Sequence, residues 1–221
     1  MKDIRLIIFD LDGTLVNAYP AIIRSFNYTM RRLKCPKQIN GVIRRSVGWG
    51  DRNLLKPFLK EADLDKALSI YRRHHAQTLI KYTSVFPGAR QVLSYLKKKG
   101  YKLAVASNRP TRFSNILMRH LGLQRYLDYS LCGDKVKHMK PNPEILNRIM
   151  HRLQVRPAQT LFVGDMFIDV QAGRRAGVKT IMLTTGSSTR EELEKERPYR
   201  IIDKLTEIIR IISLDPPHFL V

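Results

Sequence analysis

The chain begins with a short apolar run that has the composition of a buried strand. Residues 4–10 read Ile-Arg-Leu-Ile-Ile-Phe-Asp, and most of these positions are apolar or β-branched. Runs of this length and composition are typical of strands that are buried on both faces of a sheet. The Asp12-Gly13 pair then breaks the run, because this dipeptide favours a turn. We therefore predict a buried first strand that ends at Asp10.

The next part of the chain has a helical rhythm. From about residue 18 to residue 81, apolar residues recur at helical spacing, as in Ile22, Phe26 and Met30. A second apolar stripe is formed by Ala67, Leu68 and Tyr71. We predict helices throughout this stretch, and the glycine-flanked loop at 47–50 is the one place where a strand is left open.

After Pro87-Gly88 the pattern changes to an alternation of helices and strands. The predicted helices are 89–99, 111–121, one that starts at 142–144, 168–176, a short one capped by Thr189 and Glu192, and 205–212. The predicted strands are 102–107, 131–132, 160–164 and 180–184, and a tail begins at 215–217. Such alternation predicts a parallel sheet that helices cover on both faces.

The helical block interrupts this alternation directly after the first strand. We therefore predict an α/β fold in which residues 1–16 and 86–221 form a Rossmann-like parallel sheet core. Residues 17–85 would form an inserted α-helical domain.

Composition adds an unusual charge to this picture. The chain has 40 Lys and Arg against 19 Asp and Glu, which gives a formal net charge of +21. A protein this basic can attract nucleic acid, an anionic membrane or small anions. The basic residues are scattered, and no aromatic residues interleave with them as a base-stacking surface requires. We interpret them as a generic basic surface and expect no specific nucleic-acid site, although non-specific binding is open.

The apolar content and the two cysteines favour a globular protein of a reducing compartment. Hydrophobic residues make up 43% of the chain, which is enough for a packed core. No uncharged apolar run reaches the roughly 18 residues of a membrane span, and the first run is too short and interrupted for a signal peptide. Cys35 and Cys132 show no metal-ligand spacing, so we expect two free, buried thiols in the cytoplasm.

Four polar clusters stand at the ends of predicted strands or in the loops after them. They are Asp10 with Asp12, Ser107 with Asn108, Lys140, and Asp165 with Asp169. Turn and helix-cap chemistry explains each cluster alone nearly as well as a function does. In a parallel sheet, however, ligands bind beyond the carboxyl ends of the strands, which is where these clusters would meet.

Together the clusters predict a phosphoryl-transfer site. Asp10 and Asp12 are two residues apart in an extended segment, so both side chains can face one site. Several acids gathered at one place need a cation, and oxygen-only ligation favours Mg²⁺. The Ser107 hydroxyl, nearby backbone amides and Lys140 would hold a phosphate opposite the metal. A carboxylate nucleophile, a hard cation and a phosphate clamp would then be present together.

The same residues resemble the motifs of the haloacid dehalogenase superfamily. Residues 10–15, Asp-Leu-Asp-Gly-Thr-Leu, resemble the first motif, Ser107-Asn108 the second, Lys140-Pro141 the third, and Gly164-Asp165 with Asp169 the fourth. The motifs stand in the family's order, and the resemblance covers nearly the whole chain. A helical insertion between the first and second motifs is similar to the C1-type cap of one subgroup.

Further stretches resemble phosphoglycolate phosphatases. They are 47–50 with Leu54-Leu55, 86–88, 107–113 and 169–173. Two positions depart from the pattern: Asn17 stands where relatives usually carry an acid, and Met166 where a serine or threonine is common. Neither position carries the chemistry, so the departures leave only the exact subfamily open.

The resemblance assigns the chemical steps to the first motif. Asp10 would attack phosphorus and form an aspartyl-phosphate. Asp12 would protonate the departing alkoxide and then activate water, a contribution of roughly 10² to 10⁴-fold. Relatives that remove halogens lack an acid at this position, so Asp12 favours phosphate chemistry.

The resemblance also implies the metal and phosphate ligands. Mg²⁺ would be held by the Asp10 carboxylate, the Asp12 carbonyl and Asp165, while Asp169 would order this shell directly or through water. The phosphate oxygens would be bound by Ser107, Asn108 and Lys140. The cap should close over the site and exclude water.

Four residues of the predicted cap are candidates for substrate or metal binding. Trp49 would line the substrate pocket or anchor the core of the cap, and both readings stay open. Arg52 would meet a substrate carboxylate or, as we favour, lie on the solvated surface. His74 and His75 have no partner acids at ligand spacing, so we expect them on the surface and not at a metal.

The sequence therefore predicts a cytoplasmic, Mg²⁺-dependent phosphatase of small phosphorylated metabolites, with 2-phosphoglycolate first among its substrates. The alternatives are another phosphoryl-transfer enzyme of the same superfamily, namely a sugar-phosphate mutase or phosphatase, a nucleotidase or a pyrophosphatase. A third hypothesis is a basic nucleic-acid-binding protein with a vestigial site. We expect no membrane partner, and a monomer or homodimer.

Overall fold

Helices and strands alternate along most of the chain in the computed structural model, which describes residues 3–213. The strands are β1 (Leu6–Phe9), β2 (Val16–Asn17), β3 (Ser84–Val85), β4 (Lys102–Ser107), β5 (Tyr129–Cys132), β6 (Thr160–Gly164), β7 (Lys179–Leu183) and β8 (Arg200–Ile202). The helices are α1 (Tyr19–Arg32), α2 (Asn40–Arg45), α3 (Asp51–Leu55), α4 (Glu61–Thr78), α5 (Ala89–Lys98), α6 (Thr111–His120), α7 (Glu144–Leu153), α8 (Phe167–Arg175), α9 (Arg190–Lys195) and α10 (Glu207–Ser213). The tail predicted at 215–217 lies outside the described residues.

Six parallel strands form the central sheet, in the order β5-β4-β1-β6-β7-β8. This confirms the predicted parallel α/β fold. The first strand of the chain lies in the middle of the sheet, where it pairs with β4 on one side and β6 on the other. The chain segments that follow β1, β4 and β6 therefore leave the sheet side by side at its carboxyl edge.

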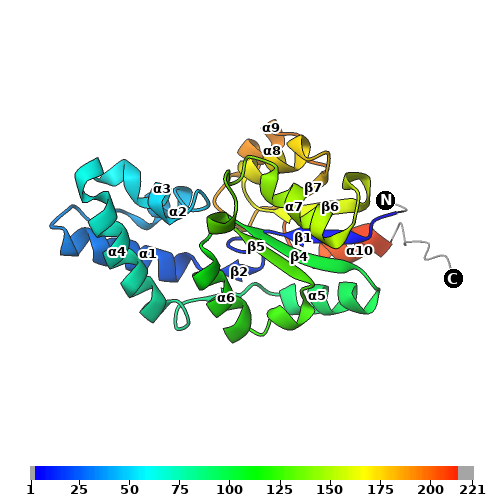
Figure 1. Cartoon of the computed structure of the whole chain (residues 1–221), viewed down its shortest axis with the longest axis horizontal. Coiled ribbons are helices and arrows are strands. Elements are labelled where there is room, and N and C mark those ends of the chain that lie inside the picture. The colour runs from blue at the N-terminus through cyan, green and yellow to red at the C-terminus, as the bar shows by residue number, and fades with distance from the viewer. Residues whose placement is uncertain (1–2, 214–221) are drawn as a thin grey trace.

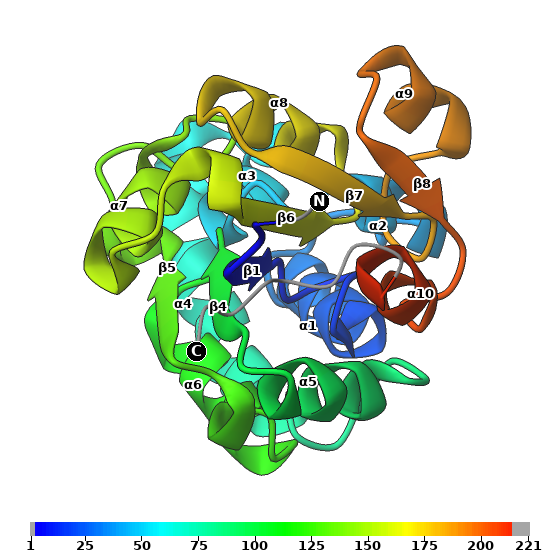
Figure 2. The same ribbon diagram turned by 90° about the vertical axis from the view of Figure 1, so that its right-hand side faces the viewer.

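Each strand of the sheet turns alternate side chains to two apolar layers. Ile7 and Phe9 face the layer that contains α5 and α10, whereas Leu6 and Ile8 face the layer that contains α7 and α8. Figure 2 shows these two pairs of helices on opposite sides of the sheet. All four β1 side chains are fully buried, and burial of each such side chain contributes about 1.5–3 kcal/mol. The first strand is thus held firmly at the place where Asp10 leaves it.

Helices α1 to α4 lie beside the sheet rather than on its faces (Figure 1). We call this part of the chain, residues 19–78, the helical segment. As predicted, it contains no strand among its described residues, and the loop at 47–50 is a turn between α2 and α3. The segment is entered and left through a small antiparallel pair in which Val16 of β2 lies opposite Val85 of β3. Its apolar side chains join the layer around α5 and α6 in one continuous cluster.

Local signals placed most of these elements correctly. The capping box predicted at Thr189 and Glu192 is present, with the Thr189 amide donating to Glu192 Oε2 at 2.8 Å. Strands β2, β3 and β8 were not predicted, because strands of two or three residues carry too little hydrophobic pattern. Cys132 is buried as expected, but Cys35 is only half-buried, and both thiols are free. None of the described helices combines the length and the apolar character that a bilayer crossing requires.

Candidate active site

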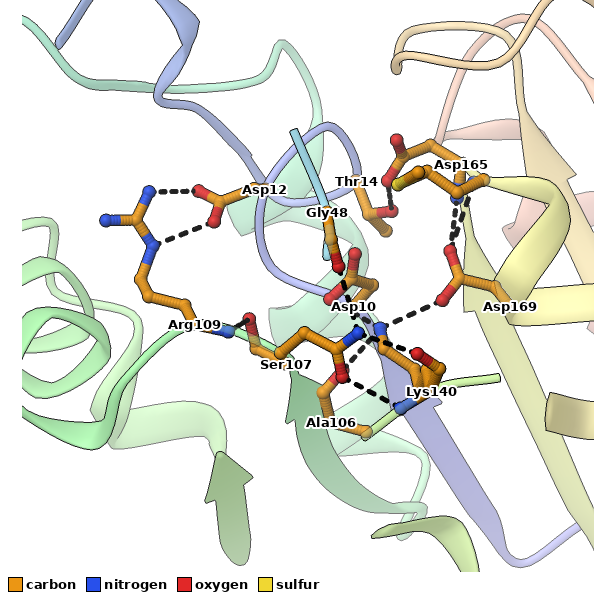
Figure 3. A network of polar contacts seen from close by, with 12 residues as sticks. Asp10, Asp12, Thr14, Gly48, Ala106, Ser107, Arg109, Lys140, Asp165 and Asp169 are labelled. Carbon is orange, nitrogen blue, oxygen red and sulfur yellow. Dashed lines mark hydrogen bonds and ion pairs between the residues drawn. The ribbon is translucent and has the colours of Figure 1, made fainter. Parts of the chain in front are cut away.

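The four polar clusters meet at the carboxyl edge of the sheet. Asp10 follows β1, Ser107 ends β4, Asp165 follows β6, and Lys140 lies in the loop between β5 and α7. Figure 3 shows the side chains of these segments turned toward one another. The central place of β1 explains the arrangement, because both neighbouring strands deliver their end residues beside Asp10.

Lys140 is the cation around which the acids gather. Its ammonium nitrogen lies 2.9 Å from Asp10 Oδ1 and 2.8 Å from Asp169 Oδ1. It also donates a hydrogen bond to the Ala106 carbonyl at 3.0 Å. Burial alone would lower the pKa of this lysine, but the Asp10 and Asp169 carboxylates outweigh it and raise the pKa of Lys140. The lysine therefore stays charged inside the protein, with its three donors engaged.

One lysine does not balance the negative charge of the cluster. Carboxylate oxygens of Asp10, Asp165 and Asp169 all lie within 4.8 Å of one another, and all three residues are buried. Burial, which Lys140 offsets only in part, raises the pKa of Asp10 to about 7. Burial, Asp10 and Asp169 raise the pKa of Asp165 well above its usual range. A group of carboxylates that resists ionisation in this way fits a hard divalent cation, which would favour their charged forms.

Asp165 is held by the turn that follows the first strand. The Thr14 hydroxyl donates to Asp165 Oδ1 at 2.8 Å in a fully buried contact. Gly13 has a positive φ of 87°, and a Cβ at this position would lie 2.4 Å from Asp165 Oδ2. The Asp-Gly-Thr turn therefore needs glycine both for its backbone conformation and for the space that the carboxylate fills.

Asp169 uses its two oxygens for different partners. Oδ1 faces Lys140, and Oδ2 accepts hydrogen bonds from the backbone amides of Asp165 at 3.2 Å and Met166 at 3.0 Å. The carboxylate thereby fixes the backbone of the loop that carries Asp165. This arrangement favours a role in orienting the cluster over direct binding of a cation, which is left mainly to Asp10 and Asp165.

The side chain of Asn108 ties three segments together. Its amide nitrogen donates to the Lys140 carbonyl at 3.0 Å and to the Gly48 carbonyl of the helical segment at 2.9 Å. Its oxygen accepts from the Lys140 amide at 3.0 Å. Asn108 therefore positions the lysine loop, while the neighbouring Ser107 hydroxyl accepts from the Arg109 amide at 3.2 Å and has its hydrogen free to donate elsewhere.

Asp12 faces away from the acid cluster, toward Arg109. The guanidinium donates from Nε to Asp12 Oδ2 at 2.7 Å and from Nη2 to Oδ1 at 2.8 Å. Its third nitrogen, Nη1, lies 2.8 Å from His75 Nε2. Of the acids predicted to bind metal, Asp12 is thus the one whose carboxylate is not part of the cluster, which leaves only its backbone carbonyl for that role.

His75 reaches this site from helix α4 of the helical segment. It is buried, with 1% of its surface exposed, so the prediction of a surface position was wrong. Burial and the adjacent Arg109 hold the pKa of His75 well below its usual range, which keeps the ring neutral. Because Arg109 can only donate, Nε2 must accept, and the proton lies on Nδ1, which faces the Ser25 hydroxyl at 3.2 Å.

A small cavity of about 50 Å³ lies over these residues. Its walls come from both parts of the chain and comprise Asp10, Asp12, Ile22, Val47, Gly48, Gly50, Asp51, Leu54, Tyr71, His75, Ser107, Asn108, Arg109, Pro110 and Phe113. Since about 10–15 Å³ of such volume is enough for one water, the cavity has room for several waters or a small ligand. Among the described residues that line it, Arg109 is the one permanently cationic side chain.

The other three residues singled out in the predicted cap do not line this cavity. His74, which we expected on the surface, is half-buried, and its ring stacks on that of Tyr28 with centroids 4.0 Å apart. Arg52 is 47% exposed and pairs with Glu61 and Asp65, as the surface reading of this residue expected. The Trp49 ring packs against Phe167 of α8 with centroids 5.9 Å apart, so it fastens the loop at 47–50 to the core.

Sequence reasoning missed Arg109 and His75, and each had a signal. Arg109 directly follows the strand-end pair Ser107-Asn108, a position that faces the site. His75 continues the apolar stripe of α4, because it stands four residues after Tyr71 and so on the same face of the helix.

Comparison with known proteins agrees with this geometry. A family model described as "Haloacid dehalogenase-like hydrolase" matches residues 7–183. A phosphoglycolate phosphatase of Cupriavidus necator is 35% identical over 186 residues, which cover 81% of this chain and 80% of that protein. A phosphoglycolate phosphatase of Aquifex aeolicus is 33% identical over 95% of this chain and 97% of its own length. Among solved structures, a predicted phosphoglycolate phosphatase from Haemophilus somnus superposes with a TM-score of 0.90 at 27% identity, covering 96% of this chain and 99% of that one.

Proposed function

Because the chain belongs to the haloacid dehalogenase-like hydrolases and is a phosphatase by its relatives, we propose that it hydrolyses a small phosphate monoester through an aspartyl-phosphate on Asp10. The substrate that we propose first is 2-phosphoglycolate, since the relatives that cover most of the chain act on it by name. The observation that carries the proposal is the buried Asp10 with Lys140 against it, at the end of the central strand.

Asp10 has the surroundings that a carboxylate nucleophile needs. Lys140 lies 2.9 Å from Oδ1 and restrains the carboxylate, which leaves Oδ2 to attack phosphorus. The same ammonium group would neutralise an oxygen of the incoming phosphoryl group. Ser107 lines the cavity beside Asp10, and its hydroxyl hydrogen is available to a phosphate oxygen. Asn108 contributes by placing Lys140.

We propose Mg²⁺ as the cation of the acid cluster. Asp10 and Asp165 would hold it together with the Asp12 carbonyl, while Asp169 orients the loop behind Asp165. When bound there, Mg²⁺ supplies positive charge to the phosphoryl oxygens that gain negative charge during transfer. The raised pKa values of Asp10 and Asp165 support a cation at this place, because the cluster is incompletely neutralised by Lys140.

We propose that the helical segment belongs to a cap domain of residues 17–85, and that residues 1–16 and 86–221 form the catalytic domain. Gly48 and His75 touch Asn108 and Arg109, so the cap is closed over the site in this structure. The cavity of about 50 Å³ beside Asp10 and Asp12 is compatible with a small leaving group such as glycolate.

The decisive variant is Asp10→Asn, in which an amide cannot attack phosphorus. We expect its turnover to fall below about a hundredth of the wild-type rate, since loss of a covalent route costs several kcal/mol, with an unchanged melting profile. The assay is phosphate release from 2-phosphoglycolate, hexose phosphates, nucleoside monophosphates and pyrophosphate, each with Mg²⁺ and with a chelator. Undiminished activity of Asp10→Asn, or activity that survives the chelator, would rule out the proposed chemistry. A tenfold preference for a nucleotide or a hexose phosphate would be consistent with a phosphatase but would rule out 2-phosphoglycolate as its preferred substrate.

Two coarser proposals complete the assignment. The free thiols Cys35 and Cys132 support a reducing compartment, for which we propose the cytoplasm. We treat the basic surface as a general attraction for small anions, and any nucleic-acid binding should collapse as the salt concentration rises.

A further inference from the structure

The ion pair between Arg109 and Asp12 engages the group that has to act on the leaving group. Both oxygens of Asp12 accept hydrogen bonds from Arg109. The two side chains are only 6% and 13% exposed, so little water competes for either of them. An acid–base group must come within hydrogen-bonding distance of the oxygen that it protonates. Asp12 can turn fully to an ester oxygen only when Arg109 has another anion to bind.

We propose that this anion is a carboxylate of the substrate, and that Arg109 selects phosphate esters whose leaving group carries it. The proposal rests on the function proposed above. A planar guanidinium binds carboxylates through two parallel hydrogen bonds, as it binds Asp12 here. In 2-phosphoglycolate the carboxylate is bonded to the carbon that bears the ester oxygen. An ester oxygen next to Asp12 therefore brings the carboxylate next to Arg109.

The charges of the cavity wall support Arg109 in this role. Of the acids in the wall, Asp51 is already neutralised by Arg72, whose Nε lies 2.6 Å from its Oδ2. Arg52, the other arginine considered, faces Glu61 and Asp65 on the exposed side of the helical segment. A leaving group without charge would leave the buried guanidinium paired with Asp12, whereas an anionic one gives it a second partner.

His75 is a positioning residue for Arg109. Its Nε2 accepts from Nη1, so the guanidinium is fixed from the side opposite to Asp12. The ring itself is held by Tyr71, which stacks on it with centroids 5.1 Å apart, and by Phe113, which lies against it in a T-shaped contact, also at 5.1 Å. Because His75 belongs to α4, the orientation of the anion-binding arginine depends on the closed position of the helical segment.

The test compares 2-phosphoglycolate with 2-hydroxyethyl phosphate, which has nearly the same size and no carboxylate. Arg109→Met keeps most of the side-chain volume and removes the charge. Loss of its support for Asp12 affects both substrates, so the ratio of their kcat/KM values isolates recognition of the carboxylate. We expect this ratio to fall by about 100-fold, the effect of a lost charge-assisted pair. Arg109→Lys keeps the positive charge but cannot form two parallel hydrogen bonds. Its kcat/KM ratio should therefore lie between those of the wild type and Arg109→Met.

His75→Phe and Arg52→Met complete the set. His75→Phe removes the hydrogen-bond acceptor and should raise the KM for 2-phosphoglycolate about tenfold, with a smaller effect on kcat. His75→Gln retains an acceptor, so its KM should lie closer to that of the wild type. Arg52→Met, a matched loss of charge outside the cavity, should leave the ratio unchanged.

The outcomes separate this inference from the function on which it rests. A ratio that falls in Arg109→Met and not in Arg52→Met supports the inference. Equal loss on both substrates, or a wild-type enzyme without preference, overturns the inference while the phosphatase stands. Hydrolysis of neither substrate by the wild-type enzyme overturns the proposed function itself.

A second measurement needs no variant and covers the case in which Arg109→Met does not fold. Glycolate should inhibit hydrolysis of 2-hydroxyethyl phosphate by the wild-type enzyme competitively, and ethylene glycol should inhibit it at least about tenfold more weakly. Equal inhibition by the two compounds contradicts a carboxylate site at Arg109.

Discussion

Replacement of Lys140 by methionine should destabilise the protein far more than loss of an ordinary surface ion pair. Lys140 lies 2.9 Å from Asp10 and 2.8 Å from Asp169, with 2% of its side chain exposed. Methionine fills similar space but leaves two buried carboxylates without a cation. Removal of one partner from a buried pair costs about 3–5 kcal/mol. At about 2–4 °C per kcal/mol for a chain of this size, the melting temperature should fall by about 6–20 °C.

The assay is thermal unfolding at pH 8 with a chelator present, so that a bound cation does not mask the loss. Lys97→Met is the matched control, because Lys97 also pairs with an acid, Asp128, while the two side chains are 40% and 30% exposed. An exposed pair of this kind contributes about 0–1 kcal/mol. We also expect Mg²⁺ to raise the melting temperature of Lys140→Met more than that of the wild type, since its carboxylates then have no other cation.

The two lysine variants give a direct refutation. If Lys140→Met melted within about 2 °C of Lys97→Met, the cluster would not depend on its lysine, and the account of charge at the site would be wrong.

Two further predictions concern the cation and the loop over the site. The raised pKa values of Asp10, to about 7, and of Asp165 mean that these carboxyls retain protons near neutrality, and a cation must displace them. Mg²⁺ binding should therefore release protons, and below pH 7 its affinity should rise by about tenfold per pH unit for each proton released. Titration calorimetry in buffers of different ionisation enthalpy measures the number of protons released. An affinity for Mg²⁺ that is independent of pH would contradict this prediction. Gly48→Ala places a methyl group 1.9 Å from Met166 Sδ at a φ of 110°, which should cost about 1–3 kcal/mol and raise the KM of the proposed substrate at least about fivefold. Gly41→Ala, whose methyl would meet nothing within 4 Å, should not change the KM, and equal KM values for the two variants would refute the role of the loop.

The sequence predicted the sheet and the acid cluster well, because both leave local signals. Strands β1, β4 and β6 each carry a buried apolar run, and the residue after each run is polar. Asp10 and Asp165 could be placed together because parallel strands send their carboxyl ends to one edge of a sheet. The order of the strands was not predicted, because the alternation of strands and helices indicates a parallel sheet but not which strands are neighbours.

The partner of Asp12 could not be predicted in the same way. Arg109 lies 97 residues away along the chain, and no local pattern states which of many arginines will meet a given acid. The orientation of Asp12 depends on how the helical segment packs, since His75 holds the other side of the guanidinium. Arg52 follows the loop at 47–50, which made it a candidate for substrate binding, but its guanidinium pairs with Glu61 and Asp65 on the exposed side of the helical segment.

The short pairing of β2 with β3 has a consequence for how such proteins change over evolutionary time. Val16 lies opposite Val85 and Asn17 opposite Ser84, so the chain leaves the core and returns to it at neighbouring points. Segments whose ends are adjacent can be lengthened, shortened or exchanged at a modest cost in loop-closure entropy. The sheet that carries Asp10 would be unaffected by such an exchange. The part of substrate choice that the helical segment controls, such as the position that His75 gives to Arg109, can thus diversify independently of the chemistry at phosphorus.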